Sequence, residues 1–269
     1  MATFIDALGR IVAIDGIPRR IVSLVPSITE ALFFWGAGPR IAGVTHFCRE
    51  PRDGVAEKVK VGGTKTVEVD RLLALRPDLV IASAEENDQE QVEAIIAAGI
   101  PVYITLPKTV EEAIEMLSVL GQMTGGGEKA QELVRQCRAA LKEVRGKVEK
   151  RGRVTVFAPI WRGPWMTIGP GTYMYDLLFE CGGEGIFPPE KGRYFHVSLE
   201  EVAALDPYVV LLPSEPFRFR PRHIGELAQA GIAAAQKGRA YLVDGRYLCW
   251  YGPRIPMALH YVSDLLLSA

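Results

Sequence analysis

The chain lacks several features that would mark a membrane, nucleic-acid-binding or disulfide-rich protein. Only four of its 269 residues are cysteine, and they are scattered without a C-x-x-C pair. We therefore predict no disulfide. No apolar run approaches the roughly 18 residues that would span a membrane. Lysine plus arginine number 31 against 32 aspartate plus glutamate, so the chain also lacks the basic excess that nucleic-acid binding requires.

Common enzyme motifs are missing as well. The sequence contains no G-x-x-x-x-G-K-[ST], no G-x-S-x-G and no H-E-x-x-H. The four histidines are spread out, and His46 with Cys48 is the only close pair of soft metal ligands. A direct zinc site needs three or four ligands at tight spacing. We predict neither a catalytic residue nor a metal-binding residue.

The composition is that of a soluble globular protein, with 48% hydrophobic and 23% charged residues. Residues 1–18 contain no basic segment followed by an apolar one, so they do not form a secretion signal. As written, the sequence favours the cytoplasm. The alternative is a mature periplasmic or cell-surface form whose signal has been removed.

Short β-branched runs alternate with helical segments along the chain. We predict strands at 20–26, 77–83, 99–105, 153–159, 207–213 and 238–244. Ser27 and Glu30 form a capping-box pattern that opens the first helix, and Asn87, with Glu90 three residues on, is predicted to cap a later one. Strands followed by helices in this way are typical of α/β proteins with parallel sheets.

Three segments of the first half recur in the second half in the same order. The segment 20–26 matches 153–159, 67–83 matches 197–213, and 99–105 matches 238–244. A repeat of this kind predicts two α/β lobes related by internal duplication.

A helical segment lies between the two copies. Residues 128–150 contain no proline and carry an apolar stripe at i, i+3, i+4 and i+7, which predicts one long helix. We therefore assign an N-terminal lobe to 1–108, an interlobe helical segment to 109–151 and a C-terminal lobe to 152–269. A rigid helix between lobes predicts a small closure when a ligand binds.

Candidate ligand-binding residues follow the predicted strands, because open parallel sheets bind ligands beyond their carboxyl ends. The aromatic ones offer flat contact area for a macrocycle, or ring faces for a cation. We expect them to lie in exposed loops that line a cleft between the lobes. The candidates are Ser27, Phe47, Lys65, Glu85, Trp161, Trp165, Tyr173, Tyr194, Glu215, Trp250, Tyr251 and Arg254.

Several segments resemble a known family. They include RIVSLVPSITEAL from Arg20, GVTHFCREP from Gly43 and VSLEEVAALDP from Val197. Together they resemble the helical-backbone solute-binding proteins of ABC importers, the receptors for vitamin B12, ferric siderophores and haem. The resemblance extends over nearly the whole chain. It implies two α/β lobes, a rigid helix between them and one ligand cleft.

The resemblance also implies a partner. In this family an acidic residue on each lobe docks onto the membrane permease, and the matching positions here are Asp70 and Glu200. An alternative reading is that both carboxylates stabilise the first turn of a helix through its dipole.

The leading hypothesis is a non-catalytic binding protein for a metal chelate, most of all cobalamin or another corrinoid. Trp161, Trp165, Trp250 and Tyr251 would stack on it, while Arg254 and Lys65 would meet its carboxylate or amide groups. We expect a monomer that requires no cofactor.

Three alternatives remain open. A ferric siderophore or haem is the first, with Tyr194 or His196 as an axial ligand of haem. A small organic cation held by Glu85 or Glu215 is the second. The third is a cytoplasmic accessory protein or enzyme that has kept the receptor fold, with Cys48 as its reactive group.

Overall fold

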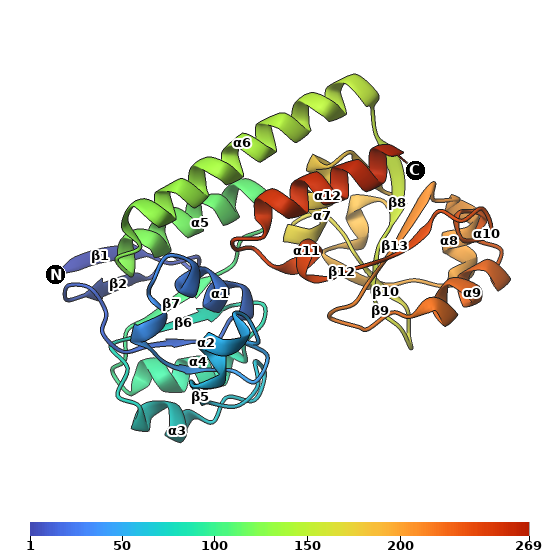
Figure 1. The fold of residues 1–269 in the computed structure, drawn as a ribbon. Helices are drawn as coiled ribbons and strands as arrows, with labels where there is room; N and C mark the ends of the chain where they lie inside the picture. The colour runs from blue at the N-terminus through green and yellow to red at the C-terminus, as the bar shows by residue number, and fades with distance from the viewer. Residues whose placement is uncertain (269) are drawn as a thin grey trace. The chain divides into compact units, whose positions relative to one another are not determined.

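The computed structural model describes residues 1–268, and internal contacts divide the chain into two compact units (Figure 1). The N-terminal unit comprises Met1–Pro107, Glu112–Arg135 and Tyr251–Pro253. The C-terminal unit comprises Lys108–Glu111, Gln136–Trp250 and the chain from Arg254 onward. Each unit has its own sheet and its own core.

The N-terminal unit is built on a five-stranded parallel sheet. Its order is β5 (Val59–Lys60), β4 (Ile41–Val44), β3 (Ile21–Ser23), β6 (Leu79–Ser83) and β7 (Val102–Thr105). The strands predicted at 20–26, 77–83 and 99–105 are thus confirmed. Residues of β3, β6 and β7 are buried throughout, as expected of central parallel strands covered on both faces.

Helices cover both faces of this sheet. Leu72 of α3 (Val69–Ala74) and Ile95 of α4 (Gln89–Ala97) pack against Val80 in the core on one side. Figure 1 shows α1 (Pro26–Phe34) on the other side of the sheet from α3. The unit also contains η1 (Gly38–Arg40), α2 (Arg52–Ala56) and an N-terminal hairpin of β1 (Ala2–Ile5) and β2 (Ile11–Ile14), which the sequence patterns did not predict.

The C-terminal unit repeats this plan with a four-stranded parallel sheet. Its order is β11 (Gly183–Gly185), β8 (Val154–Phe157), β13 (Val209–Pro213) and β14 (Ala240–Val243). Its helices are α7 (Tyr173–Glu180), α8 (Leu199–Leu205), α9 (Pro221–Gln229), α10 (Ala233–Gln236), α11 (Arg246–Cys249) and α12 (Ile255–Ser268), with the 3-10 turn η2 (Pro189–Lys191). The strands predicted at 153–159, 207–213 and 238–244 are confirmed.

A second, antiparallel sheet in this unit was not predicted. Its order is β12 (Tyr194–His196), β10 (Met166–Ile168) and β9 (Pro159–Trp161). Each of its strands has three residues, which is too short to show an alternating pattern in the sequence. This sheet positions several of the candidate aromatic residues.

The topology supports the internal duplication. β3, β6 and β7 are neighbours in the same order as β8, β13 and β14. The two positive-φ residues other than glycine among residues 1–268, Arg76 (φ 46°) and Asp206 (φ 43°), occupy the same place in the two copies. Each ends a helix and precedes a proline, so both copies make the turn into the central strand with the same backbone geometry.

The long helix predicted between the copies is confirmed as α6 (Gly127–Arg151), which follows α5 (Val110–Met123). Its apolar stripe is buried, with Cys137 and Val144 fully inaccessible. The boundary between the units falls within α6, after Arg135. Across the described 268 residues, no helix combines the length and apolar character needed to cross a bilayer.

Two predicted helix caps are wrong. Pro26 occupies the first turn of α1 and makes Val25 the N-cap, so Ser27 lies inside the helix and cannot cap it. In α4 the cap is Asp88, whose carboxylate accepts the Gln91 N–H at 3.1 Å, rather than Asn87. The N-cap therefore lies two residues earlier than predicted in α1 and one residue later than predicted in α4.

Candidate functional site

An aromatic cluster in the C-terminal unit joins β9, the loop after β13 and the start of α9. Trp161 meets Phe217 edge to face at 5.5 Å between ring centroids, and Phe217 meets Phe219 at 4.8 Å. Trp165 stacks on Phe219 at 5.6 Å, and the His223 ring lies 5.4 Å from Phe219. Offset and edge-to-face pairs of this kind stabilise one another, so the cluster is a rigid support.

Only part of this cluster reaches the surface. The Trp161 residue is 46% exposed and Phe217 is half-buried, whereas Trp165, Phe219 and His223 are buried. The loop itself is tied to the end of β13, because the Phe219 N–H donates to the Pro213 carbonyl at 3.2 Å. Trp161 and Phe217 thus form an apolar surface, and the buried rings beneath it hold it in place.

The antiparallel sheet extends this surface. Trp161 pairs with Met166, and Met166 pairs with His196, so the three side chains lie on one face of the sheet. His196 is exposed. Tyr194 is also exposed, with the Arg193 guanidinium 5.4 Å from its ring centroid. An aromatic ring, a thioether and an imidazole therefore follow one another across three strands.

Positive charge surrounds the buried end of the cluster. The Arg220 N–H donates to Nδ1 of His223 at 2.8 Å, and Nε of Arg222 lies 3.3 Å from Nε2 of the same ring. Burial lowers the pKa of His223, and the nearby charges of Arg222, Arg162 and Arg220 lower it further, against an opposing effect of Glu226. These surroundings disfavour protonation of the His223 ring.

In the N-terminal unit, the loop after β6 occupies the place that the loop after β13 has in the C-terminal unit. It is polar, and hydrogen bonds hold it against its own unit. Asn87 accepts the Ser83 N–H at 2.7 Å and donates to the carbonyls of Thr64 (3.0 Å) and Leu24 (3.4 Å). The Tyr251 hydroxyl donates to the Glu86 carboxylate at 2.7 Å. Burial and the charge of Glu86 raise the pKa of Tyr251 well above its usual range.

The predicted residues of the N-terminal unit have different surroundings. Phe47 is 54% exposed. Lys65 is exposed, but its ammonium donates to the carbonyls of Glu85 (2.8 Å) and Asn87 (3.2 Å). Ser27 is buried, and within residues 1–268 its hydroxyl has no hydrogen-bond partner. Glu85 is half-buried. Phe47 is the one large apolar contact surface that this set offers.

Several of the aromatic residues that we expected in exposed loops are buried instead. Trp165, Tyr173, Trp250 and Tyr251 are each less than a tenth exposed. The Trp250 indole N–H donates to Glu215 at 3.2 Å, and the Arg254 guanidinium lies 5.4 Å from the Trp250 ring. Neighbouring Gly, Pro and Arg residues indicated exposed loops, but the rings pack inward beneath those loops.

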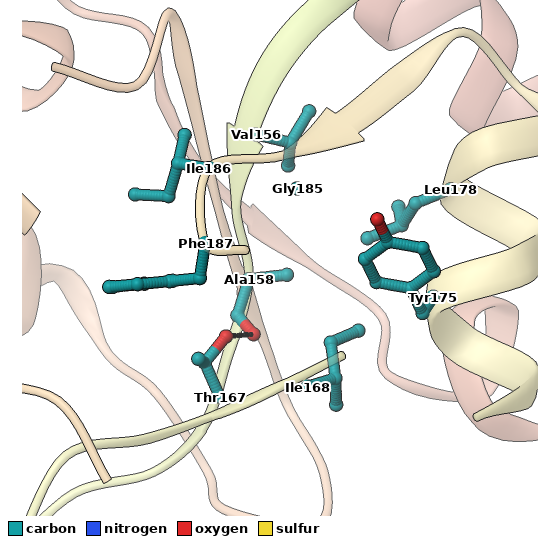
Figure 2. Close-up of a pocket in the computed structure, with 9 residues that line it drawn as sticks. All are labelled: Val156, Ala158, Thr167, Ile168, Tyr175, Leu178, Gly185, Ile186 and Phe187. Atoms are coloured by element: carbon teal, nitrogen blue, oxygen red, sulfur yellow. Dashed lines mark hydrogen bonds between the residues drawn. The ribbon is translucent and has the colours of Figure 1, made fainter. Parts of the chain in front are cut away.

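Two hollows of the structure lie away from these residues. Figure 2 shows a cavity of about 20 Å³ in the C-terminal unit, between Tyr175 and Leu178 of α7 and residues of β8, β10 and β11. This volume holds about one water molecule. An open groove of about 450 Å³ runs beside α6, lined by Ala139, Lys142, Glu143, Gly146, Lys147 and Lys150. No predicted site residue lines either one.

The Cys48 thiol lies in a buried, hydrogen-bonded environment. The Cys48 residue is 1% exposed, and burial raises the pKa of its thiol despite hydrogen bonds with Thr29 (3.1 Å) and Thr45 (3.3 Å). A buried thiol with a raised pKa is a poor nucleophile. Within residues 1–268 no three His, Cys, Asp or Glu side chains are grouped as a metal site would require.

The two candidate docking residues sit at equivalent helix starts. Asp70 lies in the first turn of α3 and Glu200 in the first turn of α8, and both are exposed. Because α3 and α8 precede the matching strands β6 and β13, each unit presents one carboxylate at the same place in its repeat.

Our sequence analysis did not select Phe217 or the arginines that follow it. The available signal is the alternating run Phe-Arg-Phe-Arg-Pro-Arg at 217–222, directly after a predicted strand. In the structure Phe217 supports Trp161, and Arg218, Arg220 and Arg222 are exposed. Met166 was also missed, because its proximity to His196 depends on a sheet that the sequence did not reveal.

Comparison with known proteins gives consistent matches. Residues 21–247 match the family model described as periplasmic binding protein. A protein named vitamin B12-binding protein from Vibrio cholerae serotype O1 is 24% identical over 92% of this chain and 89% of its own length. The names of such relatives describe bound ligands and indicate no cofactor.

Two solved structures show the same fold. A periplasmic vitamin B12 binding protein of Vibrio cholerae has a TM-score of 0.81 at 24% identity, covering 93% of this chain and 96% of that one. A periplasmic heme-binding protein from Roseiflexus sp. RS-1 in apo form has a TM-score of 0.79 at 24% identity, covering 93% and 98%.

Proposed function

Because the chain belongs to the periplasmic binding protein family, we propose that it binds a metal chelate of the corrinoid class for ABC-type import. The family fixes the general role, since its members bind solutes and are not enzymes. The chain is accordingly a non-catalytic solute-binding protein. The ligand and the contact residues are our proposal.

The observation that carries this proposal is the exposed aromatic surface of the C-terminal unit. Trp161 and Phe217 offer a flat apolar area that is already held in place by buried rings. A rigid surface loses little conformational entropy on binding, which favours a large, flat ligand. The vitamin B12-binding relatives make a corrin macrocycle the first candidate. Phe47 is the corresponding apolar contact that we assign to the N-terminal unit.

Haem is the second candidate, on a separate observation. His196 is exposed and shares a sheet face with Met166 and Trp161. Imidazole and thioether groups are both axial ligands of haem iron. Relatives of the same fold include heme-binding proteins. Replacing His196 would separate the two candidates, since a corrinoid held by stacking alone would not depend on it.

For the partner, we propose that Asp70 and Glu200 dock onto the permease of an ABC importer and that the free protein is a monomer. Their exposure and their equivalent positions in the two repeats support this role. Asp70→Lys with Glu200→Lys should leave ligand affinity unchanged and abolish uptake in cells that carry the importer. Normal uptake by this double variant would contradict the docking role.

The deciding experiment is a titration of the protein with aquocobalamin and, separately, haemin, followed by calorimetry. We expect saturable one-to-one binding of the corrinoid. Trp161→Ala and Phe217→Ala should each weaken it at least tenfold, because each removes a large stacking surface. Phe34→Ala is the matched control, since Phe34 is 45% exposed and belongs to the N-terminal unit. Absence of binding to both chelates would overturn the proposed function.

A further inference from the structure

We propose that the ligand is anionic, carrying carboxylates at its edge, and that Arg218, Arg220 and Arg222 select it. This inference rests on the proposed function and specifies the charge of the chelate. The first two arginines follow Phe217 in the loop that leads into α9, and Arg222 lies in the first turn of that helix. Nε of Arg222 is 3.3 Å from Nε2 of His223, whose ring lies 5.6 Å from Phe217, so positive charge reaches the edge of the aromatic cluster. We call Trp161, Phe217, Arg218, Arg220 and Arg222 the aromatic–arginine surface.

Several other arginines of the protein are engaged by carboxylates. Arg10 pairs with Asp6 at 2.6 Å, Arg145 with Glu180 at 2.6 Å, and Arg246 with Asp244 at 2.6 Å. In contrast, Arg218, Arg220 and Arg222 form no ion pair with a carboxylate within residues 1–268. Three exposed guanidinium groups without carboxylate partners are therefore concentrated in the five residues 218–222, at the start of α9.

The carboxylates nearby in the sequence are already in use. Glu226 pairs with Arg162 at 2.8 Å, and Glu215 accepts the Trp250 indole N–H at 3.2 Å. The local charge is accordingly positive, in agreement with the direction in which Arg222, Arg162 and Arg220 shift the pKa of His223. An anionic partner would relieve this mutual repulsion among the guanidinium groups.

The chemistry of guanidinium favours carboxylates in particular. Its planar array of donors binds both oxygens of a carboxylate, and such charge-assisted bonds are stronger than those to a neutral amide. A macrocycle lying on Trp161 and Phe217 would bring its edge groups toward the arginines of the same loop. The surface should therefore distinguish a corrin ring with carboxylate side chains from one with amide side chains.

The test compares two probes with the same macrocycle and axial ligands, dicyano-cobyrinic acid and dicyano-cobinamide. At low salt we expect the carboxylate form to bind at least tenfold more tightly than the amide form. The advantage should shrink as salt rises from about 50 to 500 mM, because the charges lie at the surface and salt screens them. The amide form should show little salt dependence.

Two double variants test whether the arginines cause this preference for the carboxylate form. Arg218→Gln with Arg220→Gln should weaken the binding of cobyrinic acid far more than that of cobinamide and so remove most of the preference. Arg71→Gln with Arg135→Gln is the control, because it removes two exposed arginines from the N-terminal unit, and it should preserve the preference. Thermal unfolding of each variant would show that all remain folded.

The outcomes separate this inference from the proposed function. Equal affinity for the two probes, or tighter binding of cobinamide, overturns the inference and leaves corrinoid binding in place. Equal weakening of both probes by the double variant also overturns it, since the arginines would then act without regard to charge. If neither probe binds, the corrinoid function and the inference fail together.

Discussion

The loops that follow β6 and β13 occupy the same place in the two repeats but differ in chemistry. After β6, Asn87 is buried and its amide ties Ser83 to Thr64 and Leu24. After β13, the matching position holds Phe217, which supports Trp161 at the surface. One loop is therefore closed onto its own unit, whereas the other presents side chains outward.

The comparison indicates that duplication conserved the backbone and left the loops free to diverge. The turns into β6 and β13 share a left-handed residue, Arg76 in one copy and Asp206 in the other. Asn87 holds its loop closed, whereas Phe217 belongs to the surface that we propose for ligand binding, so substitutions at these two equivalent positions should affect stability and binding differently.

The largest effect on stability is expected from Asn87→Ala. The change leaves the buried Ser83 N–H and two carbonyls without their amide partner, and each such group costs about 1–3 kcal/mol. We expect the free energy of unfolding to fall by about 3 kcal/mol in urea titrations. Phe217→Ala, the matching change in the other repeat, should cost about 1 kcal/mol, because Phe217 is only half-buried. Equal losses from the two changes would refute the distinction between the loops.

Tyr251→Phe should destabilise the protein by about 1.5 kcal/mol, because it removes the 2.7 Å bond to Glu86. The effect depends on pH. An unfolded tyrosine ionises near its ordinary pKa of 10.0, whereas folding holds the pKa of Tyr251 well above that value. Stability should therefore fall as the pH rises above about 10. Urea midpoints at pH 8 and 11 should show a smaller decline in Tyr251→Phe than in the parent; an identical decline would contradict this role.

The lowered pKa of His223 predicts that stability falls as the pH falls, which is opposite in direction to the effect of Tyr251. Its pKa lies below the ordinary value of 6.5, so the unfolded chain takes up the proton first as the pH falls. Stability should therefore be constant above about pH 7 and decline between pH 6.5 and 5. His223→Gln should flatten this decline in thermal unfolding measured at pH 7.5 and 5.5. If the variant loses as much stability as the parent between these two pH values, groups other than His223 cause the decline.

The smallest expected signal concerns the thiols. Cys48, Cys137 and Cys181 are buried, and burial raises the pKa of Cys137 to about 12. Cys249 is only partly buried. A thiol reagent at pH 8 should label at most one cysteine quickly in the folded protein and four after denaturation. Rapid labelling of Cys48 would revive the reading of this chain as an enzyme.

Repeated local patterns made much of the fold predictable. β-branched runs marked six strands, an apolar stripe marked α6, and the matching segments indicated the duplication. The pattern failed where one residue changed the register, as at Pro26, which moved the start of α1 ahead of Ser27. It also failed for β9, β10 and β12, whose three residues each carry too little periodicity.

The candidate site was harder to predict. Glycine and proline around Trp165 and Trp250 indicated exposed loops, but a loop can be exposed while its aromatic side chain points inward, as both tryptophans do. Burial of a side chain depends on what packs over it, which single-sequence patterns do not record. Trp161 and Tyr194 do reach the surface, and their role in binding stays a prediction.

The sequence by itself determined the alternation of strands and helices and the long helix, because residues close together in the chain set each of them. It also determined the duplication, because three segments recur in the same order. Tertiary structure alone decided which aromatic rings remain exposed, that Met166 and His196 share a face with Trp161, and that Asn87 and Phe217 differ in burial. These properties arise from contacts between segments distant in sequence. Local propensity sets the elements, whereas packing sets what the surface presents to a ligand.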